Sequence, residues 1–268
     1  MTNSSAAPAP NLKSLFASAA ASGDLTTAAA QVLSLPDYGA QIQAGLGVKV
    51  DDVHVSEVFL VAVLIDDSGS IRFAGNAQSV RDGHNAVIGA FKDSKGQGSG
   101  ILTLCRYLNG TILYEFTPLD QSIEMTTKNY DPDGGTPLYD QAIVILGTVA
   151  AKAQEFADAG VTARTATLIV TDGNDEGSRS RATDVKKVVD AMLGSEKHII
   201  AAMGISDGST DFRRVFKDMG IRDEWMLVPG NTASDIRKCF RVFSRSAVRA
   251  SQSAQGFSQT AAGGFGTP

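Results

Sequence analysis

The sequence contains few cysteines and no long apolar segment, and each scarcity excludes a class of protein. Only two cysteines, Cys105 and Cys239, occur in 268 residues, so neither a disulfide framework nor a cysteine-rich zinc site is expected. We interpret both as buried free thiols. The longest candidate for a membrane segment, Val58–Ile65, has eight residues, whereas a membrane-spanning helix needs about 20. Insertion into a membrane is therefore not expected.

No charge of one sign dominates the chain. The 24 basic and 29 acidic side chains leave a net charge of -5, which argues against extensive contact with nucleic acid. The 27 glycines and 8 prolines follow no repeating period, so collagen-like and solenoid folds are excluded. Lys13 is the only early positive charge and precedes a weakly apolar, alanine-rich stretch, unlike a secretory signal. We therefore expect a cytoplasmic protein.

The two ends of the chain differ in composition from its middle. Residues 1–10 are small, polar and punctuated by proline, which predicts a flexible tail. Residues 251–268 are rich in Ser, Gly, Gln and Ala and low in charge, which predicts a disordered tail. Residues 11–55 form a predicted N-terminal helical extension that could pack on the main domain or dock a partner. Its two helices are Leu12–Ala21, capped by Asn11, and Leu25–Leu33, capped by Asp24.

Residues 56–250 alternate between apolar strands and amphipathic helices. The dipeptide Asn109-Gly110 favours a two-residue hairpin, which predicts one antiparallel edge strand. The predicted strands are Val58–Ile65, Ile101–Leu108, Thr111–Leu119, Thr165–Thr171, His198–Ile205 and Glu224–Val228. The predicted helices are Ala77–Phe91, Leu138–Ala159, Thr183–Leu193, Phe212–Met219 and Ser234–Ala250. This alternation predicts one doubly wound α/β domain, with a mostly parallel six-stranded sheet and helices on both faces.

Oxygen-bearing side chains cluster in three loops that should open at one edge of this sheet. Ligands bind to doubly wound sheets at the carboxyl ends of the strands, near the topological switch point. The candidate donors are the carboxylates of Asp66 and Asp172 and the hydroxyls of Ser68, Ser70 and Thr136. No His or Cys joins them, and a donor set of oxygens alone selects Mg²⁺, Mn²⁺ or Ca²⁺ over zinc or copper.

The two carboxylates provide a reason for a cation to bind. At a separation of about 4 Å they would repel by roughly 4 kcal/mol at an effective dielectric constant near 20. A divalent ion converts that repulsion into attraction. Because the three hydroxyls are neutral, the ion would keep positive charge and attract an anionic ligand at an open position. Taken singly, each of these residues could equally be a helix cap or a turn former.

The order of these elements carries a family resemblance. Three elements follow one another: an apolar strand with Asp-x-Ser-x-Ser at 66–70, Gly-Gly-Thr-Pro-Leu at 134–138, and an apolar strand ending in Thr-Asp-Gly at 171–173. In this order they resemble a von Willebrand factor A (vWA) domain of intracellular bacterial type. The resemblance covers about residues 56–250 and includes a complete metal-ion-dependent adhesion site (MIDAS). The five signature positions fall on Asp66, Ser68, Ser70, Thr136 and Asp172.

The resemblance implies a role for each of these residues. Ser68, Ser70 and Thr136 would contact a Mg²⁺ ion. Asp66 and Asp172 would act partly through water, and a carboxylate of a partner protein would fill the last position. Asp67 occupies a variable position and is not expected to be a ligand. The implied function is a non-catalytic, metal-dependent protein-interaction domain that binds an Asp or Glu of its partner.

Three alternative functions stay open. The chain could be an accessory component of an ATPase or chelatase-type complex, because intracellular members of the family often partner with hexameric ATPases. It contains no phosphate-binding Gly-rich loop with lysine, so it would not itself be the ATPase. A metal-dependent phosphohydrolase would need a second acid where the chain has Ser68. An extracellular adhesin is the least favoured, because no signal sequence or disulfide framework is evident.

Two further motifs have simpler interpretations. Residues 204–208 match a nucleophile elbow around Ser206, but the last histidine, His198, precedes that serine, so the motif is interpreted as a turn. A stripe of basic residues follows one face of the last predicted helix. It is interpreted as a solvated face, with a docking surface as the alternative. The stripe consists of Arg237, Lys238, Arg241, Arg245 and Arg249.

Overall fold

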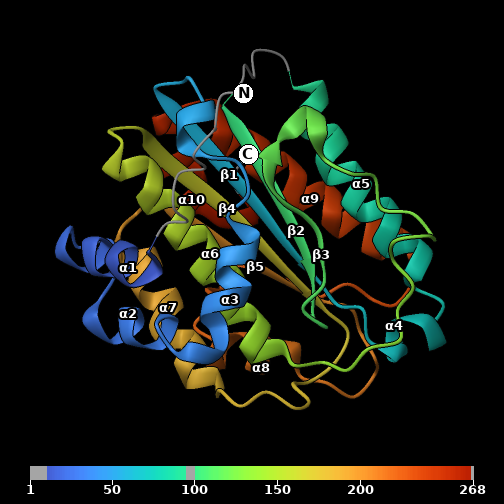
Figure 1. Cartoon of the computed structure of the whole chain (residues 1–268). Coiled ribbons are helices and arrows are strands. Elements are labelled where there is room, and N and C mark those ends of the chain that lie inside the picture. Colours follow the sequence, from blue (N-terminus) through green and yellow to red (C-terminus); the bar gives the residue numbers. More distant parts are fainter. Residues whose placement is uncertain (1–10, 95–99, 267–268) are drawn as a thin grey trace, which may run out of the picture.

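A six-stranded sheet forms the centre of the computed structural model, which describes residues 11–94 and 100–266 (Figure 1). The strands are β1 Glu57–Ile65, β2 Ile101–Tyr107, β3 Ile112–Pro118, β4 Thr162–Thr171, β5 His198–Gly204 and β6 Met226–Leu227. Their order is β3-β2-β1-β4-β5-β6. All neighbours are parallel except β3, which pairs antiparallel with β2 at the edge of the sheet. The predicted fold class, including its antiparallel edge strand, is confirmed.

The central strands are those with continuous apolar sequence. Every residue of β1 after Glu57 is buried, as is all of β5. A strand with helices on both faces has no solvated side, and therefore its sequence does not alternate between apolar and polar residues. Because β1, β2, β4 and β5 run in parallel, the loops that follow them emerge at one edge of the sheet, which we call the C-terminal edge.

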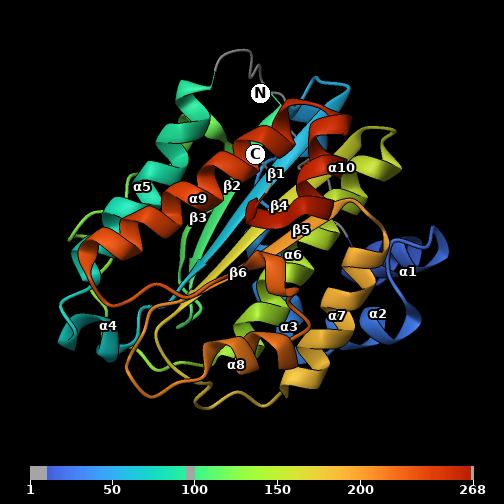
Figure 2. The ribbon, with the colours of Figure 1, turned by 180° about the vertical axis from the view of Figure 1, so that it is seen from behind.

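Helices cover both faces of the sheet. The long helix α6 packs against β1 and β4 on the face seen in Figure 1, with α7 beside it, whereas α5, α9 and α10 cover the opposite face (Figure 2). The helices of the main domain are α4 Gly69–Phe73, α5 Ala77–Asp93, α6 Leu138–Asp158, α7 Ala182–Gly194, α8 Phe212–Asp218 and α9 Ala233–Gln252. Short 3₁₀ turns occur at η1 Val50–Asp52, η2 Leu119–Gln121, η3 Asp223–Trp225 and η4 Gly264–Gly266.

The N-terminal extension contains three helices rather than two, and all three pack on α6 or α7. They are α1 Leu12–Ala21, α2 Thr27–Leu33 and α3 Pro36–Gly45. Asn11 caps α1 as predicted, but Thr26 caps α2. The predicted cap Asp24 instead forms an ion pair with Lys197. Helix α3 was not predicted, although Pro36 at its first position is a typical helix start.

Close contacts hold α3 against α6. A Cβ atom on Gly147 would lie 2.7 Å from Ile42 Cδ1, and one on Gly45 would lie 2.8 Å from Thr148 Cγ2. Both distances are shorter than ordinary van der Waals contact, so a larger residue at either position would require Ile42 or Thr148 to shift. The predicted flexible tail, residues 1–10, lies outside the described residues.

The prediction of a disordered C-terminal tail is wrong for residues 251–266. They complete α9 and form α10, Ala254–Gly263, followed by η4. Ser253 caps α10 by accepting a hydrogen bond from Gly256 N at 3.0 Å. Phe257 is buried against Phe59, with ring centroids 6.4 Å apart, and Phe265 packs on Trp225 at 4.8 Å. Two aromatic anchors therefore outweigh the polar composition that suggested disorder.

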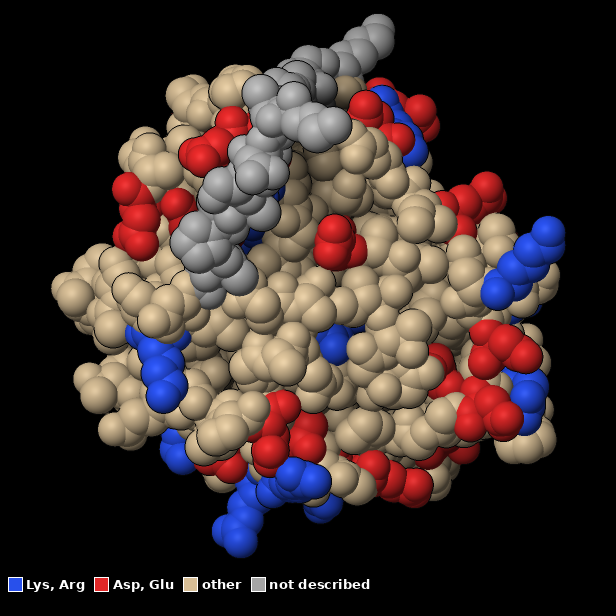
Figure 3. Space-filling model, viewed as in Figure 1, with Lys and Arg blue, Asp and Glu red and all other residues tan. Residues whose placement is uncertain are grey.

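The surface properties agree with the composition. Across residues 11–94 and 100–266, no helix combines the length and the apolar character needed to cross a membrane. On the face drawn in Figure 3, basic and acidic side chains are interspersed, mostly around the margin of the molecule. Both cysteines are free thiols, but only Cys105 is buried, since Cys239 is half-buried on α9.

Removal of the Phe257 side chain tests whether the C-terminal helix is part of the folded domain. Because the ring is 1% exposed, we expect Phe257→Ala to lower the free energy of unfolding by about 3 kcal/mol. Chemical denaturation measures this loss. Gln259→Ala, an exposed change on the same helix, serves as the control and should have little effect. A Phe257→Ala protein as stable as the wild type would contradict the packing of α10.

Candidate metal centre

The five predicted site residues lie on three loops at the C-terminal edge. Ser68 and Ser70 follow β1, where α4 begins, and Asp172 follows β4. Thr136 precedes α6. The loop after β1 and the loop that carries Thr136 are joined by backbone hydrogen bonds, from Gly134 N to Asp67 O at 2.9 Å and from Gly69 N to Gly134 O at 3.1 Å. These bonds bring the loop after β1 into direct contact with the loop before α6, which follows the antiparallel strand β3 and not a parallel strand.

Asp66 is a buried carboxylate that ties the ends of β1 and β4 together. Its Oδ1 accepts a hydrogen bond from Ser68 N at 2.8 Å. Its Oδ2 accepts hydrogen bonds from Thr171 Oγ1 at 2.7 Å and from Asp172 N at 3.2 Å. The backbone oxygen of Asp66 also accepts from the Tyr130 hydroxyl at 2.6 Å. These bonds fix the orientation of the carboxylate.

The two serine hydroxyls gather around Asp172. Ser70 Oγ donates to Asp172 Oδ1 at 2.7 Å, and Ser68 Oγ donates to the same oxygen at 3.3 Å. The two hydroxyl oxygens are 2.8 Å apart. Burial, followed by the charge of Asp66, raises the pKa of the Asp172 carboxyl to about 6. Two carboxylates and two hydroxyls therefore meet where negative charge is destabilised and a cation would be favoured.

Thr136 is placed by its backbone. It is buried, and its carbonyl oxygen accepts hydrogen bonds from Glu176 N and Leu138 N, both at 2.7 Å. The first of these bonds joins its loop to the loop that begins with Asp172. Among the described residues, no hydrogen bond engages the Thr136 hydroxyl. The structure thus places Thr136 at the same edge as the other four residues, with its side-chain oxygen available.

Asp67, the acid at the variable position, is directed elsewhere. Its Oδ1 accepts a hydrogen bond from Asn109 N, in the β2–β3 turn, at 3.0 Å. Burial is the main cause that raises its pKa to about 6. Asp67 therefore connects the first loop to the hairpin. Within the described parts of the chain, no three or more His, Cys, Asp and Glu side chains form a metal-binding group, so a cation at this edge would depend on the hydroxyls.

Sequence reasoning missed the residues that hold the loops. Asp175 Oδ1 accepts from Tyr139 N at 3.0 Å and from Ser178 Oγ at 2.5 Å. Asp175 therefore provides a side-chain acceptor for the first turn of α6, whose own N-cap is Pro137 and cannot do so. The hydrogen bond between Tyr139 and Asp175 joins residues 36 positions apart, and nothing in the local sequence indicates it.

Comparison with known proteins supports the fold. No protein-family model matches the sequence, and no curated protein matches it. Over 72% of its length the chain is similar to proximal thread matrix protein 1 from the mussel byssus, with 16% identity and a TM-score of 0.52, and covers 47% of that chain. Over 74% it is similar to the pilus adhesin SpaC from Lactobacillus rhamnosus GG, with 15% identity and a TM-score of 0.50, and covers 31% of that chain.

The chain therefore spans less than half the length of either similar structure. At these identities the likeness concerns the fold. Together with the strand order, it shows that the chain has a doubly wound α/β fold with one antiparallel edge strand.

Neutralising Asp172 should stabilise the metal-free protein. Its pKa rises from 3.8 to about 6 on folding, so ionisation opposes folding above pH 6 and has no effect below about pH 4. In EDTA at pH 7.5 we expect Asp172→Asn to raise the free energy of unfolding by about 1–2 kcal/mol. The gain should shrink as the pH falls to 4.

Denaturation with urea at several pH values measures this gain. Asp131→Asn, an exposed change in the loop that carries Thr136, should show no such gain. Equal or lower stability of Asp172→Asn over the whole pH range would contradict the cost of ionising Asp172 in its buried position beside Asp66.

Proposed function

We propose that this chain is a non-catalytic interaction domain that binds a divalent cation and uses it to capture a carboxylate of a partner protein. Mg²⁺ is the proposed ion, with Mn²⁺ or Ca²⁺ as alternatives. The observation that carries the proposal is the convergence of Ser68, Ser70 and Asp172 beside the buried Asp66. The proposed metal-site residues are Asp66, Ser68, Ser70, Thr136 and Asp172.

The donor set fits a hard cation. Ser68, Ser70 and Thr136 would hold the ion with neutral oxygens, and Asp66 and Asp172 would supply the balancing negative charge. A bound ion would supply a positive centre that accepts one more anionic oxygen. A partner Asp or Glu is the natural source of that oxygen, because a carboxylate gains a charge-assisted contact.

The positions of the histidines support a non-catalytic role. His198 begins β5, at the end opposite the site loops, and its Nδ1 lies 2.8 Å from Thr165 Oγ1. His84 lies within α5, and its Nε2 is 2.8 Å from the Tyr114 hydroxyl. His54 precedes β1. None of them is placed to act as a general base beside Ser68 or Asp172.

An exposed aromatic ring beside the site supports a protein as the partner. Phe73, in α4, is 82% exposed, and a Cβ on Gly69 would lie 3.3 Å from its Cε2 atom. The Arg72 guanidinium carbon lies 5.4 Å from the ring centroid, and Arg72 pairs with Asp133 at 2.5 Å. The ring is thus held over the loop between Ser68 and Ser70, where a docked partner would cover it. Aromatic side chains of this kind often dominate protein interfaces.

Adhesion outside the cell is the second candidate, because one similar structure is a pilus adhesin. The scarcity of cysteine, with both thiols free, favours the cytoplasm, and we propose that location. Fractionation of cells into cytoplasmic and surface material separates the two.

Divalent metal should stabilise the folded protein. At a concentration about 100 times its dissociation constant, Mg²⁺ should add about 2.7 kcal/mol, or roughly 5–10 °C in Tm for a domain of this size. Thr136→Ala should diminish this shift because it removes one ligand, whereas Thr111→Ala, on the exposed hairpin turn, should retain it. Scanning calorimetry with Mg²⁺ and with EDTA measures the shift. No response of the wild type to Mg²⁺, Mn²⁺ or Ca²⁺ would refute the proposed site.

Phe73 should contribute to partner binding without affecting the metal. We expect Phe73→Ser to weaken binding of a partner isolated by Mg²⁺-dependent capture by at least about tenfold, as for an aromatic residue central to an interface. The Mg²⁺-induced Tm shift should stay at the wild-type value. Ile123→Ser, at another exposed apolar residue with 48% exposure, is the control. Undiminished binding by Phe73→Ser in surface plasmon resonance would place the interface elsewhere.

A further inference from the structure

Helix α3 of the N-terminal extension contacts the loops that carry the candidate metal site. Figure 1 shows α3 lying along α6, and its first turn is the part near the C-terminal edge of the sheet, where Tyr38 contacts Asp140. Its first two turns contain Asp37, Tyr38 and Gln41, and each of these side chains bonds to a segment next to a site loop. These contacts are polar, and those of Tyr38 and Gln41 are partly buried, whereas that of Asp37 is exposed. Farther along the helix the packing is apolar, between Ile42 and Gly147.

Tyr38 joins α3 to two site loops through one hydroxyl. The side chain is buried, and its hydroxyl donates to Asp140 Oδ1 at 2.8 Å and lies 2.5 Å from Ser180 Oγ. Asp140 is in the first turn of α6, four residues after Thr136. Ser180 ends the loop that begins with Asp172. A single phenol group therefore fixes the distance between the segments that follow these two site residues.

Asp140 extends this connection through the backbone. It accepts hydrogen bonds from Ser180 N at 3.0 Å and from Arg179 N at 2.9 Å, and its own N–H donates to Ser178 Oγ at 3.1 Å. The Arg179 guanidinium in turn pairs with Asp37 of α3 at 2.7 Å. The loop after β4 is thus held between α6 and α3.

Gln41 makes the corresponding connection to the third loop. Its Oε1 accepts hydrogen bonds from Gln141 Nε2 at 3.1 Å and from Arg106 at 3.3 Å. Arg106 also donates to Gly110 O at 3.1 Å, in the turn whose Asn109 N–H donates to Asp67. Arg106 is a buried cation, and its hydrogen bonds go to neutral oxygens of Gln41 and Gly110. Its position therefore depends on α3 and the hairpin together.

We propose that α3 is a positioning element for the metal site, with Tyr38 as its principal residue, and that docking of α3 and binding of the metal are coupled. The inference rests on the proposed function. Residues that support ligands from behind commonly change metal affinity when altered. Coupling is reciprocal, so a metal that binds more tightly when α3 is docked must also stabilise the docked helix. A partner that displaced α3 would thereby weaken the site.

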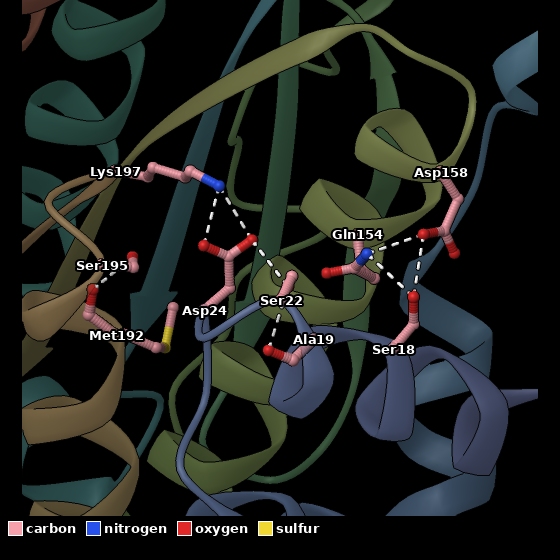
Figure 4. Close-up of polar contacts among 9 residues, drawn as sticks. All are labelled: Ser18, Ala19, Ser22, Asp24, Gln154, Asp158, Met192, Ser195 and Lys197. Carbon is pink, nitrogen blue, oxygen red and sulfur yellow. Dashed lines mark hydrogen bonds and ion pairs between the residues drawn. The ribbon is translucent and has the colours of Figure 1, made fainter.

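The other end of the extension provides a matched control. Figure 4 shows α1 and the following loop bound to the core through Ser18 and Asp24. Ser18 Oγ donates to Asp158 at the end of α6 at 2.9 Å, and Asp24 pairs with Lys197 at 2.7 Å. Asp158 ends α6 and Lys197 immediately precedes β5, so both lie at the edge of the sheet opposite the site. Ser18→Ala, like Tyr38→Phe, removes one hydroxyl between the extension and α6.

Isothermal titration of the full chain with Mg²⁺ alone tests the inference. Tyr38→Phe should raise the dissociation constant for Mg²⁺ about tenfold. Ser180→Ala, which removes the second partner of that hydroxyl, should also raise it. Ser18→Ala should bind Mg²⁺ as the wild type does. Hydrogen exchange adds a measurement that a purely structural role would not affect. Mg²⁺ should slow exchange of the α3 amides in the wild type, leave those of α1 unchanged, and slow α3 less in Tyr38→Phe.

The outcomes separate this inference from the proposed function. If the wild type binds no divalent ion, the proposed function fails and the coupling fails with it. If the wild type binds Mg²⁺ and Tyr38→Phe binds it with the same dissociation constant, the positioning role alone is overturned. An equal loss of affinity in Tyr38→Phe and Ser18→Ala would also overturn it, because the effect would then reflect general stability.

Discussion

The proximity of two buried carboxylates, Asp66 and Asp172, governs the chemistry of this molecule. Parallel pairing of β1 with β4 places the residues that follow the two strands side by side. The pairing continues in register to Ile65 and Val170, so the chain leaves both strands at the same edge of the sheet. The fold therefore holds two carboxylates together in a buried position, where burial, followed by the charge of Asp66, raises the pKa of Asp172 to about 6. Such opposition between stability and local charge is typical of functional sites.

Hydroxyl groups suit positions 68 and 70 because they can form favourable contacts both without a cation and with one. Without a cation, Ser68 and Ser70 donate their protons to Asp172 and reduce the cost of its charge. With a cation, the same oxygens could offer lone pairs, since a hydroxyl is both donor and acceptor. A carboxylate in either place would add a third negative charge to the metal-free state. The residue types at 68 and 70 are therefore consistent with reversible binding.

The sequence predicted what depends on local pattern. Continuous apolar runs located β1, β4 and β5, and the loops after them identified Asp66 and Asp172 before the structure placed them together. Local composition gave the wrong prediction where a few contacts between residues far apart in the sequence determine the structure. The C-terminal residues look disordered, yet Phe257 and Phe265 anchor them to β1 and to η3. Likewise, Asp140 and Tyr38 bond across 102 residues, and no periodicity indicates such a pair.

The loops of the site explain why the extension matters to it. Apart from one isolated bridge between Gly134 and Ser68, the segment from Ser122 to Pro137 has no helix or strand of its own, and the loop from Asp172 to Arg181 has none either. Loops with few apolar contacts open locally at low cost in free energy. Their hydrogen bonds to Asp140 and Asp175 limit that opening, and Tyr38 holds Asp140 from α3. The extension thus contributes order to the two loops that carry Thr136 and Asp172, where the α/β core alone leaves the chain without regular structure.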